Sequence, residues 1–166
     1  GFSISERTKK FNIFSSYNYG YRGGTNLINL NTGYYKGSQL IGSTQQYEAL
    51  KVPITTNAAR LGADFFADGK TTIGFIADGG ITQFNSAETT ITYSYDSANK
   101  PAEYNITNSY SPNKIYNYSE NLNFKHTLDS AGGEILINLD YANYNNTGYQ
   151  NVSTDYYNFN NTIAAS

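Results

Sequence analysis

A twelve-residue stretch near the start of the chain, "FNIFSSYNYGYR", alternates in polarity along almost its whole length. Phe11, Ile13 and Tyr17 fall on one side of an extended chain, because successive side chains of a strand point to opposite faces. Asn12 and Arg22 fall on the other side. In a soluble, half-buried strand the aromatic side would face a protein core. In a strand that crosses a membrane as part of a β-barrel, the aromatic side faces lipid and the polar side faces a wet lumen.

The composition favours the second environment. Seventeen Tyr and nine Phe accompany no Trp, Met or Cys, and Asp, Glu, Lys and Arg make up 14% of the 166 residues. A soluble domain carries about a quarter of charged residues, and a disordered chain is poor in aromatics. A net charge of −2 offers no basic field for nucleic acid. No apolar run approaches the roughly 18 residues of a membrane helix, whereas a barrel strand needs only about 9–11.

The same alternation recurs along the chain. "RLGADFF" and "TTIGFIAD" flank Asp68-Gly69, which is a strong hairpin signal between alternating runs. The best helical candidate, "STQQYEALKV", is short and is followed by Pro53, so no helix is expected there. We expect about six membrane strands within a single segment, 1–166; they span 1–7, 11–22, 57–67, 71–82, 116–128 and 134–145.

Short turns alternate with long connections. The turns fall at 7–10, 67–70 and 129–133, and the segments 23–56, 79–115 and 145–166 are predicted to be extracellular loops. In the second loop, "ETTITYSYD" and "AEYNITNSYS" predict a hairpin. Loops longer than about 12–15 residues are uncommon in compact domains, but outer-membrane barrels combine short periplasmic turns with long extracellular loops.

These patterns predict an all-β fold, an antiparallel up-and-down meander that forms part of a transmembrane β-barrel in the bacterial outer membrane. Two alternatives remain open. One is a soluble extracellular β-sandwich or adhesin-like binding module, in which the same apolar residues would form a core. The other is a small closed barrel of about eight strands, which this length would suit.

The expected faces define two sets of residues. The outward aromatic residues are predicted to form a girdle, because Tyr keeps its ring in the membrane interface and its hydroxyl in water: Phe11, Tyr17, Tyr19, Tyr21, Phe65, Tyr116, Tyr118, Phe124 and Tyr141. The charged residues of opposite parity are predicted to line the lumen: Arg22, Arg60, Asp64, Asp78, Lys125 and Asp140. Gly62, on the lumen side, is expected to let a plug or loop approach the wall closely.

Three stretches also resemble a known family. "RTKKFNIFSSYNYGYR", "RLGADFFADGKTTIGF" and "NLNFKHTLDSAGGEILINLDYANYNN" are similar, in this order, to the barrel of TonB-dependent outer-membrane receptors from Bacteroidetes. The resemblance implies a barrel of about twenty-two strands closed around a plug and energised by TonB. Because only about six strands are expected, the chain would be a segment of such a receptor. No ligand-binding motif of the family is matched.

The resemblance implies a receptor or transporter that takes up or binds a nutrient, metal chelate, glycan or peptide, or holds a partner protein. Its partners would be outer-membrane lipid, the rest of the barrel with its plug, TonB indirectly, and a surface lipoprotein or other complex subunits. Enzymatic activity is not expected, since the Ser residues lack the context of a nucleophile. No cofactor or metal is expected either, because His126 is the only His and no Cys is present.

Overall fold

The computed structural model describes residues 1–129, 131–159 and 163–165, and its regular elements are all β-strands. The strands are antiparallel, so the predicted all-β, antiparallel fold class is confirmed. The chain divides into two compact units, and β6 (Thr71–Asp96) and β7 (Pro101–Thr127) contribute residues to both. Unit 1 comprises Gly1–Tyr21, Thr55–Gln83 and Lys114–Thr147; unit 2 comprises Arg22–Ile54, Phe84–Asn113 and Gly148–Ser166.

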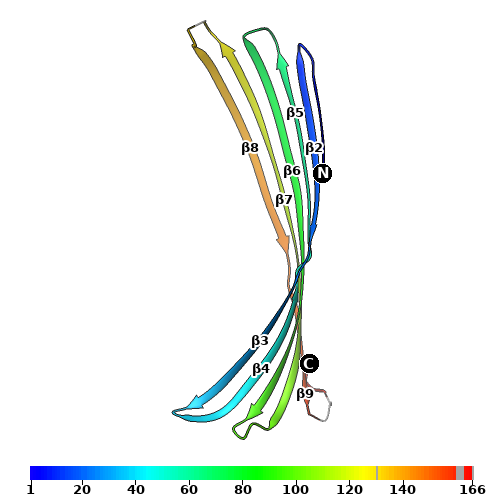
Figure 1. Cartoon of the computed structure of the whole chain (residues 1–166), viewed down its shortest axis with the longest axis vertical. Helices are drawn as coiled ribbons and strands as arrows, with labels where there is room; N and C mark the ends of the chain where they lie inside the picture. The colour runs from blue at the N-terminus through cyan, green and yellow to red at the C-terminus, as the bar shows by residue number, and fades with distance from the viewer. Residues whose placement is uncertain (130, 160–162, 166) are drawn as a thin grey trace. The chain divides into compact units, whose positions relative to one another are not determined.

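In unit 1 the strands pair in the order β1-β2-β5-β6-β7-β8 (Figure 1). Besides parts of β6 and β7, they are β1 (Phe2–Arg7), β2 (Phe11–Arg22), β5 (Ile54–Phe66) and β8 (Glu134–Gly148). These six strands overlap the six ranges expected from the alternation. β2 lies beside β5 and not beside β3, since β3 and β4 form a hairpin of their own.

The three short turns of unit 1 lie at the same end of its sheet (Figure 1). The Phe66 amide donates to the carbonyl of Lys10 at 2.8 Å, which links the β1–β2 turn to the end of β5. The Thr127 amide donates to the carbonyl of Lys70 at 2.9 Å, which links the β5–β6 turn to the end of β7. Neighbouring turns are therefore held together by backbone hydrogen bonds.

Unit 2 contains β3 (Thr25–Lys36), β4 (Gln39–Lys51), β9 (Asn151–Asn158) and β10 (Ile163–Ala165), together with parts of β6 and β7. β4 pairs with β3 and β6, and β9 pairs with β7 and β10. The hairpin between β6 and β7 closes where the Asp96 amide donates to the carbonyl of Lys100 at 3.0 Å. Asn99 has a φ of 59° in this turn, a conformation that Asn tolerates better than most residues.

The segments predicted as long loops consist largely of strands. Most of 23–56 is the β3–β4 hairpin, which was not predicted. The hairpin predicted within 79–115 is confirmed, and its two strands continue β6 and β7. Part of 145–166 is β9. Within this segment 160–162 and 166 lie outside the described residues, as does 130 in the predicted turn 129–133. The strands β3 and β4 escaped the prediction because Thr, Tyr, Asn and Gln fill much of them and their Leu and Ile residues do not alternate with a period of two. Thr and Tyr favour strands, and a strand surface needs no apolar face where it meets water.

No hydrophobic side chain is buried among the described residues. Large apolar side chains of unit 1, such as Ile4, Leu61 and Leu139, are instead exposed. A β-sandwich buries the inner faces of two sheets against each other. The described part of the chain therefore does not contain the sandwich core that the soluble alternative requires.

Candidate functional site

Cross-strand contacts show that unit 1 has two chemically distinct faces. The rings of Phe11 and Phe65 lie 5.1 Å apart, so odd residues of β2 and β5 share a face. The rings of Tyr118 and Tyr141 lie 5.7 Å apart, so even residues of β7 share a face with odd residues of β8. The contact of Thr71 Oγ1 with His126 Nδ1 at 2.9 Å joins the odd residues of β6 to the even residues of β7.

This alternation collects most of the aliphatic and phenyl side chains of unit 1 on what we call the apolar face. Phe14, Phe66, Ile76 and Leu136 have the opposite parity. The members of the apolar face are Ile4, Phe11, Ile13, Leu61, Phe65, Ile73, Phe75, Leu122, Phe124, Ile135, Ile137 and Leu139. Most of these side chains are exposed.

The nine residues expected to form an aromatic girdle fall on the same parity. Beyond the two ring pairs already described, Tyr17 donates its hydroxyl to Asn57 Oδ1 at 2.6 Å and packs 5.9 Å from the ring of Phe2. Lys114 places its ammonium 4.9 Å from the ring of Tyr116. Tyr19 and Tyr21 are exposed near the end of β2, and Phe124 stacks 6.5 Å from the ring of His126.

The opposite side of unit 1 is the polar face, defined by Asn12, Arg60, Asp64, Asp78, Asn121, Asn123, Lys125, Glu134 and Asp140. Between β5 and β6, Arg60 Nε donates to Asp78 Oδ1 at 2.6 Å. Between β2 and β5, the Asn12 amide donates to Asp64 Oδ2 at 2.9 Å. The even residues of β2, β5 and β6 therefore share this face.

The polar face continues across β7 and β8. The Asn121 amide donates to Asp140 Oδ1 at 2.7 Å, and Lys125 Nζ lies 2.8 Å from Glu134 Oε2. Five of the six predicted lumen residues are thus on one face and have polar partners on neighbouring strands. Glu134 also lies on the polar face but was not among the predicted lumen residues. Its parity, opposite to that of Ile135, would have placed it on this face.

Arg22 does not belong to this group. It is the last residue of β2, is exposed, and is part of unit 2.

Glycines of the polar face are covered by side chains from neighbouring strands. A Cβ atom at Gly62 would collide with the ring of Phe14, and one at Gly74 would collide with the side-chain amide of Asn123. Gly62 was expected to give a plug or loop close access to the wall. This expectation is wrong, because the Phe14 ring occupies that space.

Unit 2 carries a row of aromatic rings that the sequence reading did not single out. Tyr47, Tyr93, Tyr104 and Tyr157 follow one another across β4, β6, β7 and β9, with ring centroids 6.1, 5.6 and 4.8 Å apart. Tyr104 is the direct cross-strand partner of Tyr157, and their rings are stacked. Such cross-strand pairs stabilise a sheet.

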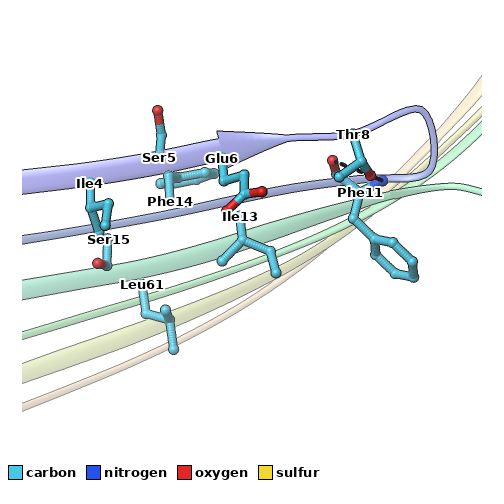
Figure 2. A pocket seen from close by; sticks show the side chains of 9 residues that line it. All are labelled: Ile4, Ser5, Glu6, Thr8, Phe11, Ile13, Phe14, Ser15 and Leu61. Atoms are coloured by element: carbon cyan, nitrogen blue, oxygen red, sulfur yellow. Dashed lines mark hydrogen bonds between the residues drawn. The ribbon is translucent and has the colours of Figure 1, made fainter.

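A depression of about 420 Å³ lies where β1, β2 and β5 run side by side (Figure 2). Most of its lining residues have the parity of the apolar face, and Ser5 and Phe14, which also line it, have the opposite parity. Ile4, Ile13 and Leu61 contribute its aliphatic walls, and the half-buried Ser15 lies between Ile4 and Leu61. Glu6 is the charged residue in its lining. The depression is thus largely apolar with one carboxylate.

The β5–β6 turn is organised by a carboxylate. Asp68 Oδ1 accepts a hydrogen bond from the Lys70 amide at 2.7 Å. This hydrogen bond, assisted by the Thr71 hydroxyl, holds the pKa of the Asp68 carboxyl below its usual value. Asp68 therefore acts in turn formation, as its position in an Asp-Gly turn predicts.

Among the described residues, no group of three or more His, Cys, Asp or Glu side chains is placed to hold a metal ion. The described part of the chain also contains no helix long and apolar enough to cross a membrane. The fold and site define an all-β, antiparallel protein with a two-faced sheet. No protein-family model and no curated protein matches this chain.

Proposed function

We propose that this chain is a segment of the wall of an outer-membrane β-barrel receptor of the TonB-dependent type. The observation that carries the proposal is the apolar face of unit 1, which is exposed in a sheet with no buried hydrophobic side chain among the described residues. Its parity matches the outward face of a membrane barrel, on which apolar side chains alternate with inward polar ones.

Exposure of the apolar face to water is energetically costly. Leaving a Leu, Ile or Phe side chain in water rather than burying it forgoes roughly 1.5–3 kcal/mol for each residue. Leu61, Ile137 and Leu139 are each more than half exposed, at 53%, 51% and 62%. The twelve residues of the apolar face are on average about half exposed, so the total loss is roughly 9–18 kcal/mol, which is comparable to the stability of an ordinary domain, about 5–15 kcal/mol. Outer-membrane lipid would remove this cost along the entire face at once.

The polar face supports the same assignment. Arg60 with Asp78, and Lys125 with Glu134, pair across neighbouring strands while remaining partly exposed. Such pairs are stable beside water and expensive in hydrocarbon, where an Arg costs about 2–4 kcal/mol at the midplane. In the proposed receptor this face lines the lumen and contacts the plug or a passing solute.

The sheet edges support a segment of a larger wall. In unit 1, β1 pairs only with β2 and β8 pairs only with β7 in the described sheet. Unpaired strand edges expose backbone hydrogen-bonding groups, and a closed barrel satisfies them with neighbouring strands. The partners would therefore be the remaining barrel strands and the plug, with TonB acting through the plug, and a surface lipoprotein or other subunits outside. The ligand would be a nutrient, chelate, glycan or peptide, or a partner protein would be held there.

Membrane insertion tests the proposal directly. The chain is refolded in the presence and absence of phospholipid vesicles, and the vesicles are then floated and washed at alkaline pH. We expect the chain to remain with the vesicles and to require detergent when they are absent. A monodisperse chain that stays in solution without detergent would contradict the proposal and favour a soluble binding module.

A further inference from the structure

The depression on the apolar face contains a charged side chain that the proposed function does not explain. Glu6 lies opposite Ile13 in the β1–β2 register, so it shares the face of Ile4 and Ile13. A carboxylate on such a face is costly unless it lies near water or a cation. Glu6 is the second-to-last residue of β1, close to the turn, so it would lie near the membrane surface and not at its centre.

We call this depression the channel, because its lining residues extend along β2 away from this turn. Its lining runs from Phe11, at the turn end of β2, to Ser15, and four strand residues span about 13 Å. The small Ser15 side chain between the branched side chains of Ile4 and Leu61 leaves the hollow (Figure 2). A volume of about 420 Å³ lies within the usual range of small-molecule sites, about 300–1,000 Å³.

Both signs of charge gather at the turn end of this channel. Lys9 and Lys10 lie in the turn that follows Glu6, and all three side chains are exposed. Thr8 is occupied locally, since its hydroxyl donates to the Phe11 carbonyl at 3.2 Å and accepts from the Phe11 amide at 3.0 Å. The available groups are therefore one carboxylate and two ammonium groups beside an apolar channel.

We infer that this channel binds one acyl chain of a phospholipid that carries a primary ammonium group. The acyl chain lies along Ile4, Ile13 and Leu61, the lipid ammonium pairs with Glu6, and the lipid phosphate pairs with Lys9 or Lys10. A carboxylate next to lysines complements a head group that has one cation and one anion, whereas an anionic lipid would meet repulsion at Glu6. The inference rests on the proposed function, in which this face meets lipid.

Native mass spectrometry of the chain in detergent micelles tests the inference with three added lipids that share the same acyl chains. Phosphatidylethanolamine has the primary ammonium, phosphatidylcholine has a quaternary one that donates no N–H hydrogen bond, and phosphatidylglycerol has none. We expect phosphatidylethanolamine to be retained about threefold more than either of the others, the size of effect that a partly exposed charge pair supplies. Glu6→Gln should abolish the preference, and Ser15→Phe should lower retention of all three lipids.

Two control variants match these changes elsewhere in the chain. Glu103→Gln removes an exposed carboxylate in unit 2, and Ser3→Phe adds a ring on the other side of β1 from Ile4. Both should bind lipid as the unmodified chain does. Glu6 is exposed, so Glu6→Gln is not expected to disturb folding. The lipid preference can therefore be tested with Glu6→Gln even if Ser15→Phe does not fold.

Equal retention of the three lipids, or a preference that survives Glu6→Gln, would overturn the inference. Vesicle flotation separates this failure from failure of the proposed function. A chain that inserts into vesicles without lipid preference would refute the channel alone. A chain that binds phosphatidylethanolamine in micelles but does not insert would refute the barrel assignment and leave the channel standing.

Discussion

Replacing Leu61 by arginine places a charge on the apolar face of unit 1, which would meet hydrocarbon in the proposed barrel. Leu61 is 53% exposed and lies five residues from Phe66, the last residue of β5 before the short turn. At about 3.3 Å for each residue the distance along the strand is roughly 17 Å. With a strand tilt of about 40° this corresponds to a depth of roughly 13 Å, close to the middle of an apolar band about 25 Å tall.

An arginine at that depth costs about 2–4 kcal/mol in a membrane barrel. This corresponds to a roughly 30-fold to 700-fold decrease in the equilibrium constant for folding into the bilayer. Ile76→Arg is the matched control, because Ile76 is five residues into β6 after the same turn and shares the parity of Asp78 on the polar face. Its arginine would reach water in the lumen, so we expect a much smaller loss.

Urea titration of the chain folded in vesicles measures both variants, and heat-modifiable gel mobility reports the folded fraction. Leu61→Arg should shift the transition strongly to lower urea, and Ile76→Arg should shift it little. Equal losses from the two variants would show that the faces are misassigned. A greater loss from Ile76→Arg would invert them.

Two further predictions concern packing and pH. Gly62→Ala should destabilise unit 1 by about 1–3 kcal/mol in urea unfolding, because the new methyl group displaces the Phe14 ring. Gly69→Ala is the control and should have little effect, since there is open space around Gly69. A loss of stability from Gly62→Ala that persists in the Phe14→Ala background would contradict this explanation. The lowered pKa of the Asp68 carboxyl means that its stabilisation of the turn is fully present above the unfolded pKa of about 3.9 and is lost as pH falls through the still lower folded pKa. The stability difference between the unmodified chain and Asp68→Ala should therefore be constant near neutral pH and shrink below about pH 4. Slow hydrogen exchange at the Lys70 amide should be lost over the same range. A stability difference that is unchanged at about pH 2 would refute the role of the Asp68 charge.

The strands of unit 1 were predictable because their apolar side chains alternate with period two. Phe11 and Ile13 in β2, and Ile135 and Ile137 in β8, each marked a face without any knowledge of the neighbouring strand. β3 and β4 were missed because their apolar residues do not keep a period of two: Leu27 and Ile28 are adjacent in β3, and Leu40 and Ile41 are adjacent in β4. Hydrophobic periodicity gives no signal where apolar side chains fall on both faces of a strand.

The charged residues of the polar face followed from parity, but their partners did not. Arg60 and Asp78 are eighteen positions apart, and their contact depends on the register set by the β5–β6 turn. The same holds for Gly62, whose covering ring comes from Phe14 on a strand distant in sequence. Cross-strand register is a property of the assembled sheet, so single-strand patterns predict faces and leave contacts undetermined.

Spin-label accessibility along β5 tests directly whether the apolar face of unit 1 meets lipid. The chain has no cysteine, so a label is attached to a single Cys introduced in turn at positions 60, 61, 63, 64 and 65 in the vesicle-bound chain; Gly62 is left unlabelled because the Phe14 ring covers it. We expect accessibility to oxygen, which concentrates in lipid, to be greatest at 61, 63 and 65. Accessibility to a water-soluble nickel complex should be greatest at 60 and 64. Uniform accessibility to the nickel complex, or the opposite alternation, would contradict the claim that the apolar face of unit 1 meets lipid.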